Sequence, residues 1–398
     1  MTSTLQFNPF AYDVQQDPYP HYAALHAVAP VAWLEAFGAY VATGFDEVRS
    51  IATRPQIFSS AGLIQRFFGE LSPVPEVPWL IDLDPPRHPE VRRLVNRTFT
   101  PRTIEAFLPR IEEIVEDLVG RMAEKEGFDL VEDLAKPLPV IVIAELLGVA
   151  HDRHADFVRW SDDIMRSVNQ PTDSDVIAGI RRTITEFRAH FLAEIADRKA
   201  SPRDDLLSSL VQIQQSEGLL SEYDVLALCV IILMAGNETT RRAIGNTTLA
   251  LLEFPEQLCA LTARPQLLPM AIEEGVRFNS PILGVPRVAL ESARVGDAFI
   301  EAGKAVMLMW GMANRDPRHF PDPNQFIITR TPNDHLGFGV GNHFCLGAPL
   351  ARHEVNLALR RLLFDCAGFE MVDDVPEWDP TPLNRGLVSL PLRWTSRH

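Results

Sequence analysis

The chain has 398 residues, 46% of them hydrophobic and 23% charged, which is enough apolar material for a sizeable folded core. Its formal net charge of −16 argues against a nucleic-acid partner, because binding phosphate backbones needs a basic face. No stretch reaches the roughly 20 apolar residues that cross a bilayer, and the first residues lack the pattern of a signal peptide. We therefore expect a cytoplasmic protein that binds neither nucleic acid nor membrane.

Hydrophobic periodicity predicts a mainly α-helical chain with a small, mostly antiparallel β-rich lobe. In chain order, the expected elements are strands at 31–34 and 39–43, helices at 104–122, 140–147 and 177–195, strands at 294–295 with 298–300 and at 305–308, a helix at 350–363, and a strand at 387–394. Thirty-one prolines punctuate the chain, but no internal repeat or low-complexity linker divides it. We expect residues 1–398 to form a single domain with an α-rich and a β-rich lobe.

The segment 73–79 contains Pro75 and Pro78 and so cannot form a regular helix. It is predicted to be an exposed loop. Binding residues often lie in such loops, and a simple spacer is an equally good interpretation.

A long helix is expected to begin at Ser221, which forms a capping-box pattern with Asp224, and to continue to about Glu253. Residues 225–235 are apolar on almost every face, which indicates burial in the core. Polar residues then interrupt this run at 236–240. Gly236 costs about 1 kcal/mol relative to alanine in a helix, and a flat ligand lying against the bare backbone would explain it; the alternative is an ordinary hydrogen-bonded kink.

Four cysteines occur without CxxC spacing, so neither a zinc site nor a disulfide framework is indicated. Cys345 differs from the rest because it follows a glycine-rich stretch and immediately precedes a predicted helix. The positive end of a helix dipole and nearby amide donors stabilise a thiolate, so the Cys345 sulfur is suited to bind a metal. Cys229, Cys259 and Cys366 are predicted to be buried structural cysteines.

The decapeptide from Phe338 to Gly347 resembles the haem-binding loop of the cytochrome P450 family. The matching positions are Phe338, Gly339, Gly341, His343, Cys345 and Gly347. This resemblance implies the cytochrome P450 fold, with haem b between the long central helix and the helix after the cysteine loop. It also implies that Cys345 ligates the iron, since a thiolate ligand favours cleavage of the O–O bond.

Other segments extend the resemblance. Residues 235–240 are similar to the family's oxygen-activation helix, and 274–277 to its Glu-x-x-Arg helix. Without the cysteine loop, Glu274 and Arg277 would be read first as a surface ion pair. Residues 313–326 resemble the meander before the cysteine loop. The residues implied to contact haem, apart from those of the cysteine loop, are Ala235 and Gly236, with the haem carboxylates held by His88, Arg92, Arg287 and His343. A solvated surface role is the alternative for these four carboxylate partners.

The resemblance implies a monooxygenase that uses O2 to oxidise a small lipophilic substrate. Thr239 and Glu238 would then be catalytic and deliver protons during oxygen activation, while Glu274 and Arg277 would be structural. No redox module follows the haem domain, which predicts electrons from a ferredoxin and an NAD(P)H-dependent ferredoxin reductase. Basic residues near the cysteine loop could contact an acidic ferredoxin or be ordinary solvated charges: Arg352, Arg360 and Arg361.

By the same resemblance, apolar residues would line the substrate pocket together with the loop at 73–83. They are Ile231, Met234, Leu283, Val285, Leu387 and Val388. Such a lining would accept a fatty acid, terpenoid, steroid or macrolide-like compound without choosing among them. A peroxide-using peroxygenase and a non-catalytic haem-thiolate sensor or carrier are the alternative functions. Arg241 and Arg242, directly after the threonine pair, depart from a purely buried helix and have no explanation in the sequence.

Overall fold

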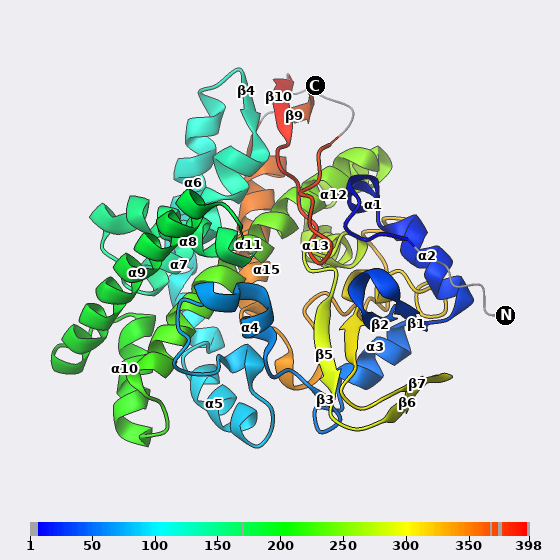
Figure 1. Cartoon of the computed structure of the whole chain (residues 1–398). Coiled ribbons are helices and arrows are strands. Elements are labelled where there is room, and N and C mark those ends of the chain that lie inside the picture. Colours follow the sequence, from blue (N-terminus) through cyan, green and yellow to red (C-terminus); the bar gives the residue numbers. More distant parts are fainter. Residues whose placement is uncertain (1–6, 169–170, 367, 373–375, 396–398) are drawn as a thin grey trace. The chain divides into compact units, whose positions relative to one another are not determined.

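The computed structural model describes residues 7–168, 171–366, 368–372 and 376–395 (Figure 1). Its backbone divides into two compact units, described one at a time below. Unit 1 comprises Met1–Ser59, Val115–Ala135 and Thr239–His398, and unit 2 comprises Ser60–Ile114 and Lys136–Glu238. Two helices, α6 (Pro101–Ala123) and α11 (Glu222–Glu253), contribute residues to both units.

Unit 1 contains a five-stranded sheet in the order β1-β2-β8-β5-β3. Its strands are β1 (Val31–Leu34), β2 (Ala39–Ala42), β3 (Phe58–Ser59), β5 (Val285–Ala289) and β8 (Ala305–Leu308). β2 and β8 pair in parallel and the other pairs are antiparallel. Pro286 lies within β5, opposite Met307 of β8, but β3 pairs only with Val288 and Ala289. The missing N–H of Pro286 therefore falls where β5 is an edge strand, the position that a sheet tolerates.

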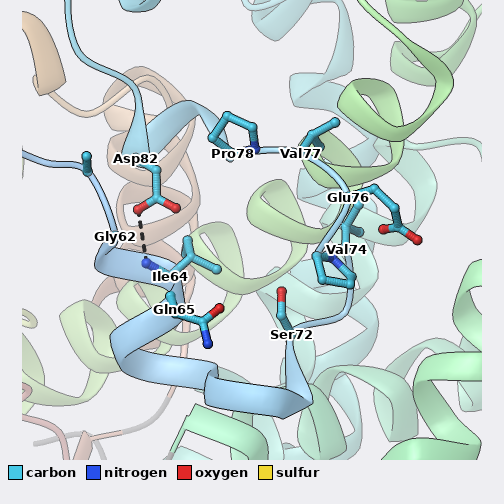
Figure 2. Close-up of a pocket in the computed structure, with 11 residues that line it drawn as sticks. Gly62, Ile64, Gln65, Ser72, Val74, Glu76, Val77, Pro78 and Asp82 are labelled. Atoms are coloured by element: carbon cyan, nitrogen blue, oxygen red, sulfur yellow. Dashed lines mark hydrogen bonds between the residues drawn. The ribbon is translucent and has the colours of Figure 1, made fainter.

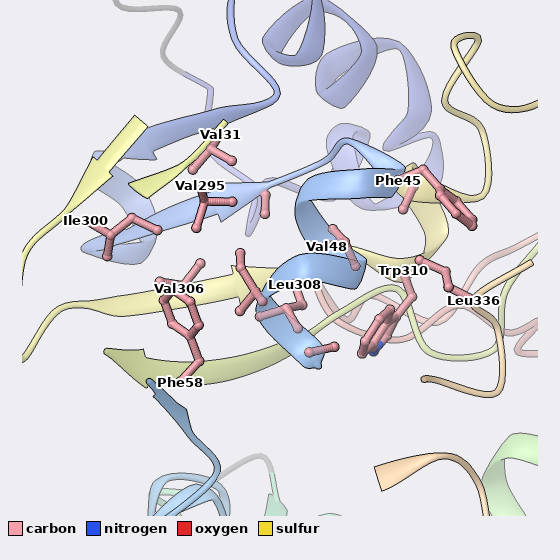
Figure 3. Close-up of a cluster of buried hydrophobic side chains, with 14 of the residues drawn as sticks. Val31, Phe45, Val48, Phe58, Val295, Ile300, Val306, Leu308, Trp310 and Leu336 are labelled. Carbon is pink, nitrogen blue, oxygen red and sulfur yellow. The ribbon is translucent and has the colours of Figure 1, made fainter. Parts of the chain in front are cut away.

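The core of unit 1 forms where one face of this sheet meets α3 (Phe45–Ala52). Figure 3 shows Val48 of α3 with Val306 and Leu308 of β8 among the buried side chains. Phe45 begins α3, and its amide N–H donates to Asp316 Oδ2 at 2.8 Å, which satisfies one of the donors that a helix N-terminus leaves open. Alternating apolar strand positions and one apolar helix stripe thus close the same core.

The remaining elements of unit 1 are two small sheets and several helices. The sheets are β4 (Gly127–Asp129), β10 (Pro391–Thr395) and β9 (Gly368–Met371) in that order, and the hairpin β6 (Ala293–Val295) with β7 (Ala298–Ile300). The helices are α1 (Tyr12–Gln16), α2 (Tyr19–Val28), α12 (Pro255–Ala263), α13 (Leu268–Phe278), α14 (Trp310–Ala313) and α15 (Ala348–Arg360). α13 packs against α15, and this contact supports the candidate site.

Unit 2 is helical. Its helices are α4 (Leu63–Phe68), α5 (Arg87–Asn96), α7 (Pro137–Leu146), α8 (His154–Val168), α9 (Ser174–Ala200) and α10 (Leu206–Glu217). α8 packs against both α7 and α9. Aromatic side chains fill the α8–α9 contact, where the Trp160 and Phe187 rings meet edge to face with centroids 5.8 Å apart, a favourable geometry for ring quadrupoles.

The long helix α11 begins as predicted. The Ser221 amide donates to Asp224 Oδ2 at 2.7 Å, and the Asp224 amide donates to Ser221 Oγ at 3.1 Å, the two reciprocal bonds of a capping box. By length and composition α11 is also apolar enough to cross a membrane, contrary to our expectation for the chain, but 56% of its apolar window is buried inside the protein. This burial is what the core helix of a folded protein shows.

The structure confirms a mainly helical chain with small β-sheets. The four helices predicted besides α11 correspond to α6, α7, α9 and α15, although α15 passes into a π-turn at residues 361–365. The strand expected at 387–394 was placed too early, because the β10 ladder begins at Pro391 and Leu387 makes only an isolated bridge to Trp378. The short strands β3, β4 and β9, and the proline-containing β5, were not predicted.

Candidate active site

The loop before α15 presents Cys345 on a tightly specified backbone. Gly339 and Gly341 have φ of +71° and +73°, in the left-handed region that glycine adopts without strain. A Cβ at Gly341 would also lie 3.1 Å from the Ala52 carbonyl oxygen. The Cys345 amide donates to the Phe338 carbonyl at 2.8 Å. The loop is therefore closed on itself, with its cysteine three residues before α15.

The surroundings of Cys345 differ from those of Cys229. Cys345 is half-buried, stands at the positive end of α15, and its charge contributes to a raised pKa of Arg352, whose largest cause is the hydrogen bond to Glu273. Cys229 is completely buried, and desolvation raises the pKa of its thiol well above the ordinary value. Only the first environment suits a thiolate ligand.

The other two cysteines are both less buried than expected. Cys259 was predicted to be buried, but it is exposed on α12, and Cys366 is half-buried. Cys259 occupies an outward-facing position of a short helix, which the sequence pattern did not resolve. Cys345 remains the cysteine that combines partial access with a helix N-terminus.

A stripe in the middle of α11 is less buried than most of the residues around it. Ile231, Met234, Glu238 and Thr239 are half-buried and Ala235 is exposed, whereas Ile232, Leu233 and Thr240 are buried. The spacing i, i+3, i+4, i+7, i+8 places all five on one helix face. The expectation that residues 225–235 are buried on every face was wrong for this stripe. Its apolar part, followed by a carboxyl and a hydroxyl, fits an apolar substrate and an oxygen-activating group.

Gly236 has a packing explanation that the sequence did not give. A Cβ built at Gly236 would lie 2.8 Å from Ile143 Cδ1 of α7, closer than side chains approach. The missing side chain lets α7 and α11 meet, so close approach of a ligand is not needed to account for this glycine. Next to it, the buried Asn237 donates from Nδ2 to Ser161 Oγ of α8 at 2.7 Å, which fixes the rotation of α11 within unit 2.

The structure explains Arg242, which the sequence left unaccounted for. Its guanidinium donates to Asp379 Oδ2 at 3.0 Å, and the residue is only 5% exposed. A Cβ at Gly386 would lie 2.3 Å from Arg242 Cγ, so the side chain runs across a glycine. Arg241 is half-buried. Arg242 is thus a paired, buried arginine that points toward the C-terminal part of unit 1.

Glu274 and Arg277 form a fully buried ion pair, with 0% exposure of either side chain. Arg277 donates from Nε and Nη2 to the two Glu274 oxygens at 2.8 Å each, the fork geometry that arginine favours. It also donates to the carbonyls of Asn314, Pro323 and Gln325. The surface alternative does not hold, because the pair anchors the irregular segment that leads to the cysteine loop.

A third member of this cluster was missed by sequence reasoning. Arg330 Nε lies 3.1 and 3.2 Å from the two Glu274 oxygens. Arg330 is in an irregular segment with no periodic pattern, so the sequence offered no signal for its partner. Asn333 and the Ile327 amide also donate to Glu274, which satisfies the acceptors of the buried carboxylate.

The four residues expected to hold haem carboxylates are divided between the units. In unit 1, Arg287 on β5 is 6% exposed and donates to the Pro286 carbonyl, while His343 is half-buried in the short turn Gly341–His343. In unit 2, His88 is buried on α5. One turn later, Arg92 donates to Asn96 Oδ1 at 2.9 Å.

The expected substrate-pocket residues occupy three kinds of environment. Ile231 and Met234 lie on the α11 stripe. Leu283 and Leu387 are each 2% exposed within unit 1. Val285 is half-buried on β5 and Val388 is exposed. In this structure Leu283 belongs to an apolar core cluster with Met307 and Met309.

A cavity of about 290 Å³ lies in unit 2 beside α4 (Figure 2). Its lining residues are Ala61, Gly62, Ile64, Gln65, Ser72, Val74, Pro75, Glu76, Val77, Pro78 and Asp82. Asp82 accepts the Ile64 amide at 3.0 Å, as the dashed line in Figure 2 shows, and burial raises the pKa of its carboxyl. Much of the segment 73–79 therefore forms one wall of this cavity.

The segment 73–79 is non-helical as predicted, but it is not simply an exposed loop. Val74 and Trp79 are 0% and 1% exposed, and Trp79 Nε1 donates to the Val74 carbonyl at 3.0 Å. Arg188 of α9 donates to the Pro73 carbonyl at 2.7 Å and to Glu76 Oε2 at 3.0 Å. Buried apolar anchors and one arginine therefore fix the segment to unit 2.

The environment of Cys345 fits a thiolate ligand of haem iron. A family model for cytochrome P450 matches residues 80–394. The chain belongs to the cytochrome P450 family. Members of this family bind haem b and are oxidoreductases, so this P450 is a haem-thiolate monooxygenase. The haem supplies the chemistry of O2 activation when bound, and Cys345 is the residue that would hold its iron.

Similar proteins cover most or nearly all of the P450. Cytochrome P450 107B1 of Saccharopolyspora erythraea is 36% identical over 393 residues, which span 95% of each chain. Mycinamicin IV hydroxylase/epoxidase of Micromonospora griseorubida is 39% identical over 323 residues, 79% of each chain. The structure of cytochrome P450 CYP109Q5 from Chondromyces apiculatus matches with a TM-score of 0.89 and 35% identity, covering 98% of this chain and 99% of that one.

Proposed function

We propose that this P450 inserts one atom of O2 into a small lipophilic substrate, by hydroxylation or epoxidation, with electrons from a ferredoxin and its NAD(P)H-dependent reductase. In hydroxylation a C–H bond becomes C–OH, the second oxygen atom leaves as water, and NAD(P)H is oxidised. We also propose that residues 1–398 act as one haem-binding domain in the cytoplasm. The relative named for hydroxylation and epoxidation of mycinamicin IV supports both reaction types.

The α11 stripe carries this proposal. Ile231, Met234 and Ala235 offer an apolar surface, which binds by shape and hydrophobicity rather than by polar anchors. One turn further, Glu238 and Thr239 bring a carboxyl and a hydroxyl to the same face. A carboxyl can relay protons from solvent, and a hydroxyl can hold a water in place. The order of residues along one face thus separates substrate contact from proton delivery.

We propose that the haem carboxylates are held by His88, Arg92, Arg287 and His343. The low exposure of His88 and Arg287 supports this role, because a buried carboxylate needs cationic or donor partners. Phe338, Gly339 and Gly347 would shape the cysteine loop against the cofactor. Ala235 and Gly236 on α11 would also contact the cofactor. Val285, Val388, Leu283 and Leu387 remain proposed pocket residues.

The ferredoxin proposal assigns its contact to the exposed part of α15. Of the three arginines considered, Arg352 is engaged by Glu273 at 2.6 Å, and Arg361 lies 3.7 Å from Asp365 and 3.9 Å from Glu116. Arg360 is exposed. We therefore assign Arg360 the larger share of the attraction to an acidic partner.

The experiment has two stages. A panel containing a macrolide, a steroid, a terpenoid and a fatty acid is titrated into the holoenzyme, and a low-spin to high-spin shift of the haem spectrum identifies binders. Each binder is then incubated with ferredoxin, reductase and NAD(P)H, or with hydrogen peroxide alone. Product in the first mixture supports the proposal. Product with peroxide alone would instead establish a peroxygenase, and no product in either mixture would favour a sensor or carrier.

A further inference from the structure

Glu273 of α13 bonds to residues on both sides of the cysteine loop. Arg352 of α15 donates to Glu273 from Nε at 2.6 Å and from Nη2 at 2.8 Å. His335, which precedes the loop, lies with Nε2 3.2 Å from Glu273 Oε2. Glu273 is adjacent to Glu274 but has a separate set of partners. One carboxylate thus connects the segment that enters the loop to the helix that leaves it.

The hydrogen bonds around His335 assign the roles of its two ring nitrogens. The Gly337 amide donates to His335 Nδ1 at 3.1 Å, so Nδ1 is an acceptor and carries no proton. Nε2 must then carry the proton and donate it to Glu273. The His335 side chain is only 3% exposed, so water does not readily replace this bond. His335 is therefore a donor through Nε2, and its partner has to be an acceptor.

The same network reaches Cys345 through Phe338. The Arg352 guanidinium lies over the Phe338 ring, 4.3 Å from its centroid, in a cation–π contact. The His335 ring lies 5.9 Å from the same ring. The Phe338 carbonyl accepts the Cys345 amide at 2.8 Å. Glu273 thereby holds Arg352 and His335, and both of these side chains contact the Phe338 ring. Phe338 in turn accepts the hydrogen bond from the Cys345 backbone.

We propose that Glu273 is a positioning residue: through Arg352 and His335 it holds the backbone of the cysteine loop at Phe338, so that the Cys345 sulfur keeps its place as the iron ligand. This inference rests on the proposed role of Cys345. In this proposal Arg352 acts through its geometry as well as its charge. A lysine at 352 would supply a cation, but neither two parallel bonds to Glu273 nor a planar group on Phe338.

Substitutions at Glu273 separate charge from hydrogen bonding. Glu273→Gln keeps the size of the side chain, but its NH2 group faces Arg352 Nε in one orientation and both Arg352 Nη2 and His335 Nε2 in the other, so one or two bonds are lost. Glu273→Ala loses all of them. Arg352→Lys keeps the positive charge and loses the fork, and Arg352→Ala loses both.

The experiment follows the ferrous carbon monoxide complex of each holoenzyme below its unfolding temperature. Conversion from the thiolate-bound to the thiol-bound spectrum is timed. We expect conversion at least about tenfold faster in Glu273→Ala, since about that factor follows from losing a single charge-assisted contact and this variant loses several. Glu273→Gln should be intermediate, and Arg352→Lys should also convert faster than wild type.

Two controls exclude a general effect. Glu370→Gln removes a carboxylate from an exposed pair with Arg393 and should convert at the wild-type rate. Asp379→Asn removes the partner of buried Arg242 and gives a variant destabilised elsewhere in unit 1. The inference would be overturned if Glu273→Ala converted at the wild-type rate, or no faster than an equally destabilised Asp379→Asn. It would also be overturned if Arg352→Lys converted at the wild-type rate. A wild-type protein without any thiolate-bound spectrum would instead overturn the role of Cys345.

Discussion

The side chain that Gly236 lacks would collide with Ile143, since a Cβ there would lie 2.8 Å from Cδ1 and 3.1 Å from Cγ1. We expect Gly236→Ala to destabilise the protein even though alanine favours a helix by about 1 kcal/mol. Adding Ile143→Val, which removes Cδ1, should recover roughly 1 kcal/mol by coupling of the two sites. Urea unfolding of the single and double variants measures this recovery.

The control is Gly120→Ala on α6, where a Cβ would meet no atom within 4 Å; it should not destabilise the protein. Additive effects of the substitutions at 143 and 236 would refute the contact.

Thr239 and Thr240 differ in the face that they occupy. Thr239 lies on the α11 stripe, whereas Thr240 is 2% exposed. Replacing Thr239 with valine should keep substrate binding but lower product formed per NAD(P)H roughly tenfold or more, with peroxide or water formed instead, since a positioned proton donor contributes at least that factor. Thr240→Val is the matched control and should keep its coupling. If both variants formed the same amount of product per NAD(P)H, Thr239 would have no role in proton delivery.

The pair between Arg242 and Asp379 should matter more than an exposed pair. Arg242 has 4% side-chain exposure and Asp379 30%. Asp379→Asn should therefore cost about 1–3 kcal/mol, because it leaves a buried charge without its counter-ion. Glu370→Gln at the exposed pair with Arg393 should cost about 0–1 kcal/mol. Chemical unfolding of both variants tests the difference, and similar losses would contradict the burial argument.

Glu273 should contribute to acid sensitivity. Burial would raise the pKa of Glu273, but hydrogen bonds from Arg352 and His335 outweigh it and lower the pKa from 4.5 to about 2. A carboxyl with a lowered folded-state pKa stabilises the protein above its unfolded pKa, and this stability is lost as pH falls toward the folded value. Glu273→Gln should therefore show a shallower loss of unfolding free energy than wild type between pH 4.5 and about 2. Parallel pH profiles would count against the lowered pKa.

Arg188 should control the mobility of the segment 73–79. It donates to the Pro73 carbonyl and to Glu76, and hydrogen bonding to Arg188 lowers the pKa of that carboxyl. Arg188→Ala should speed amide exchange in this segment about tenfold, because local opening loses one charge-assisted contact. Arg181→Ala on the same helix removes an exposed contact to Glu70 at 3.8 Å and should leave exchange unchanged. Hydrogen–deuterium exchange compares the two, and equal protection in Arg188→Ala would show that Val74 and Trp79 hold the segment alone.

Local patterns predicted the elements that depend on neighbouring residues. The Ser221–Asp224 cap and the strand at 31–34 are both specified by side chains within a few positions. The family likeness of the cysteine loop then gave the cofactor and the class of reaction. These features are predictable because their hydrogen bonds and backbone angles are local.

Contacts between distant segments were not predictable from the sequence. Arg330 meets Glu274 across 56 positions, and nothing near Arg330 marks it as buried. The reason for Gly236 is a side chain on another helix, and Pro286 fits a strand only because β3 is too short to pair with it. A single sequence records such residues without recording what they touch.

The Arg242 side chain crosses over Gly386, and this contact couples the evolution of two positions that lie 144 residues apart. A bulkier residue at 386 becomes admissible only when the long side chain at 242 is replaced by a short one, so homologues should exchange the two together. For directed evolution, libraries that randomise either site alone will mostly sample sequences with a steric conflict, whereas paired codons open the combinations that the backbone accepts.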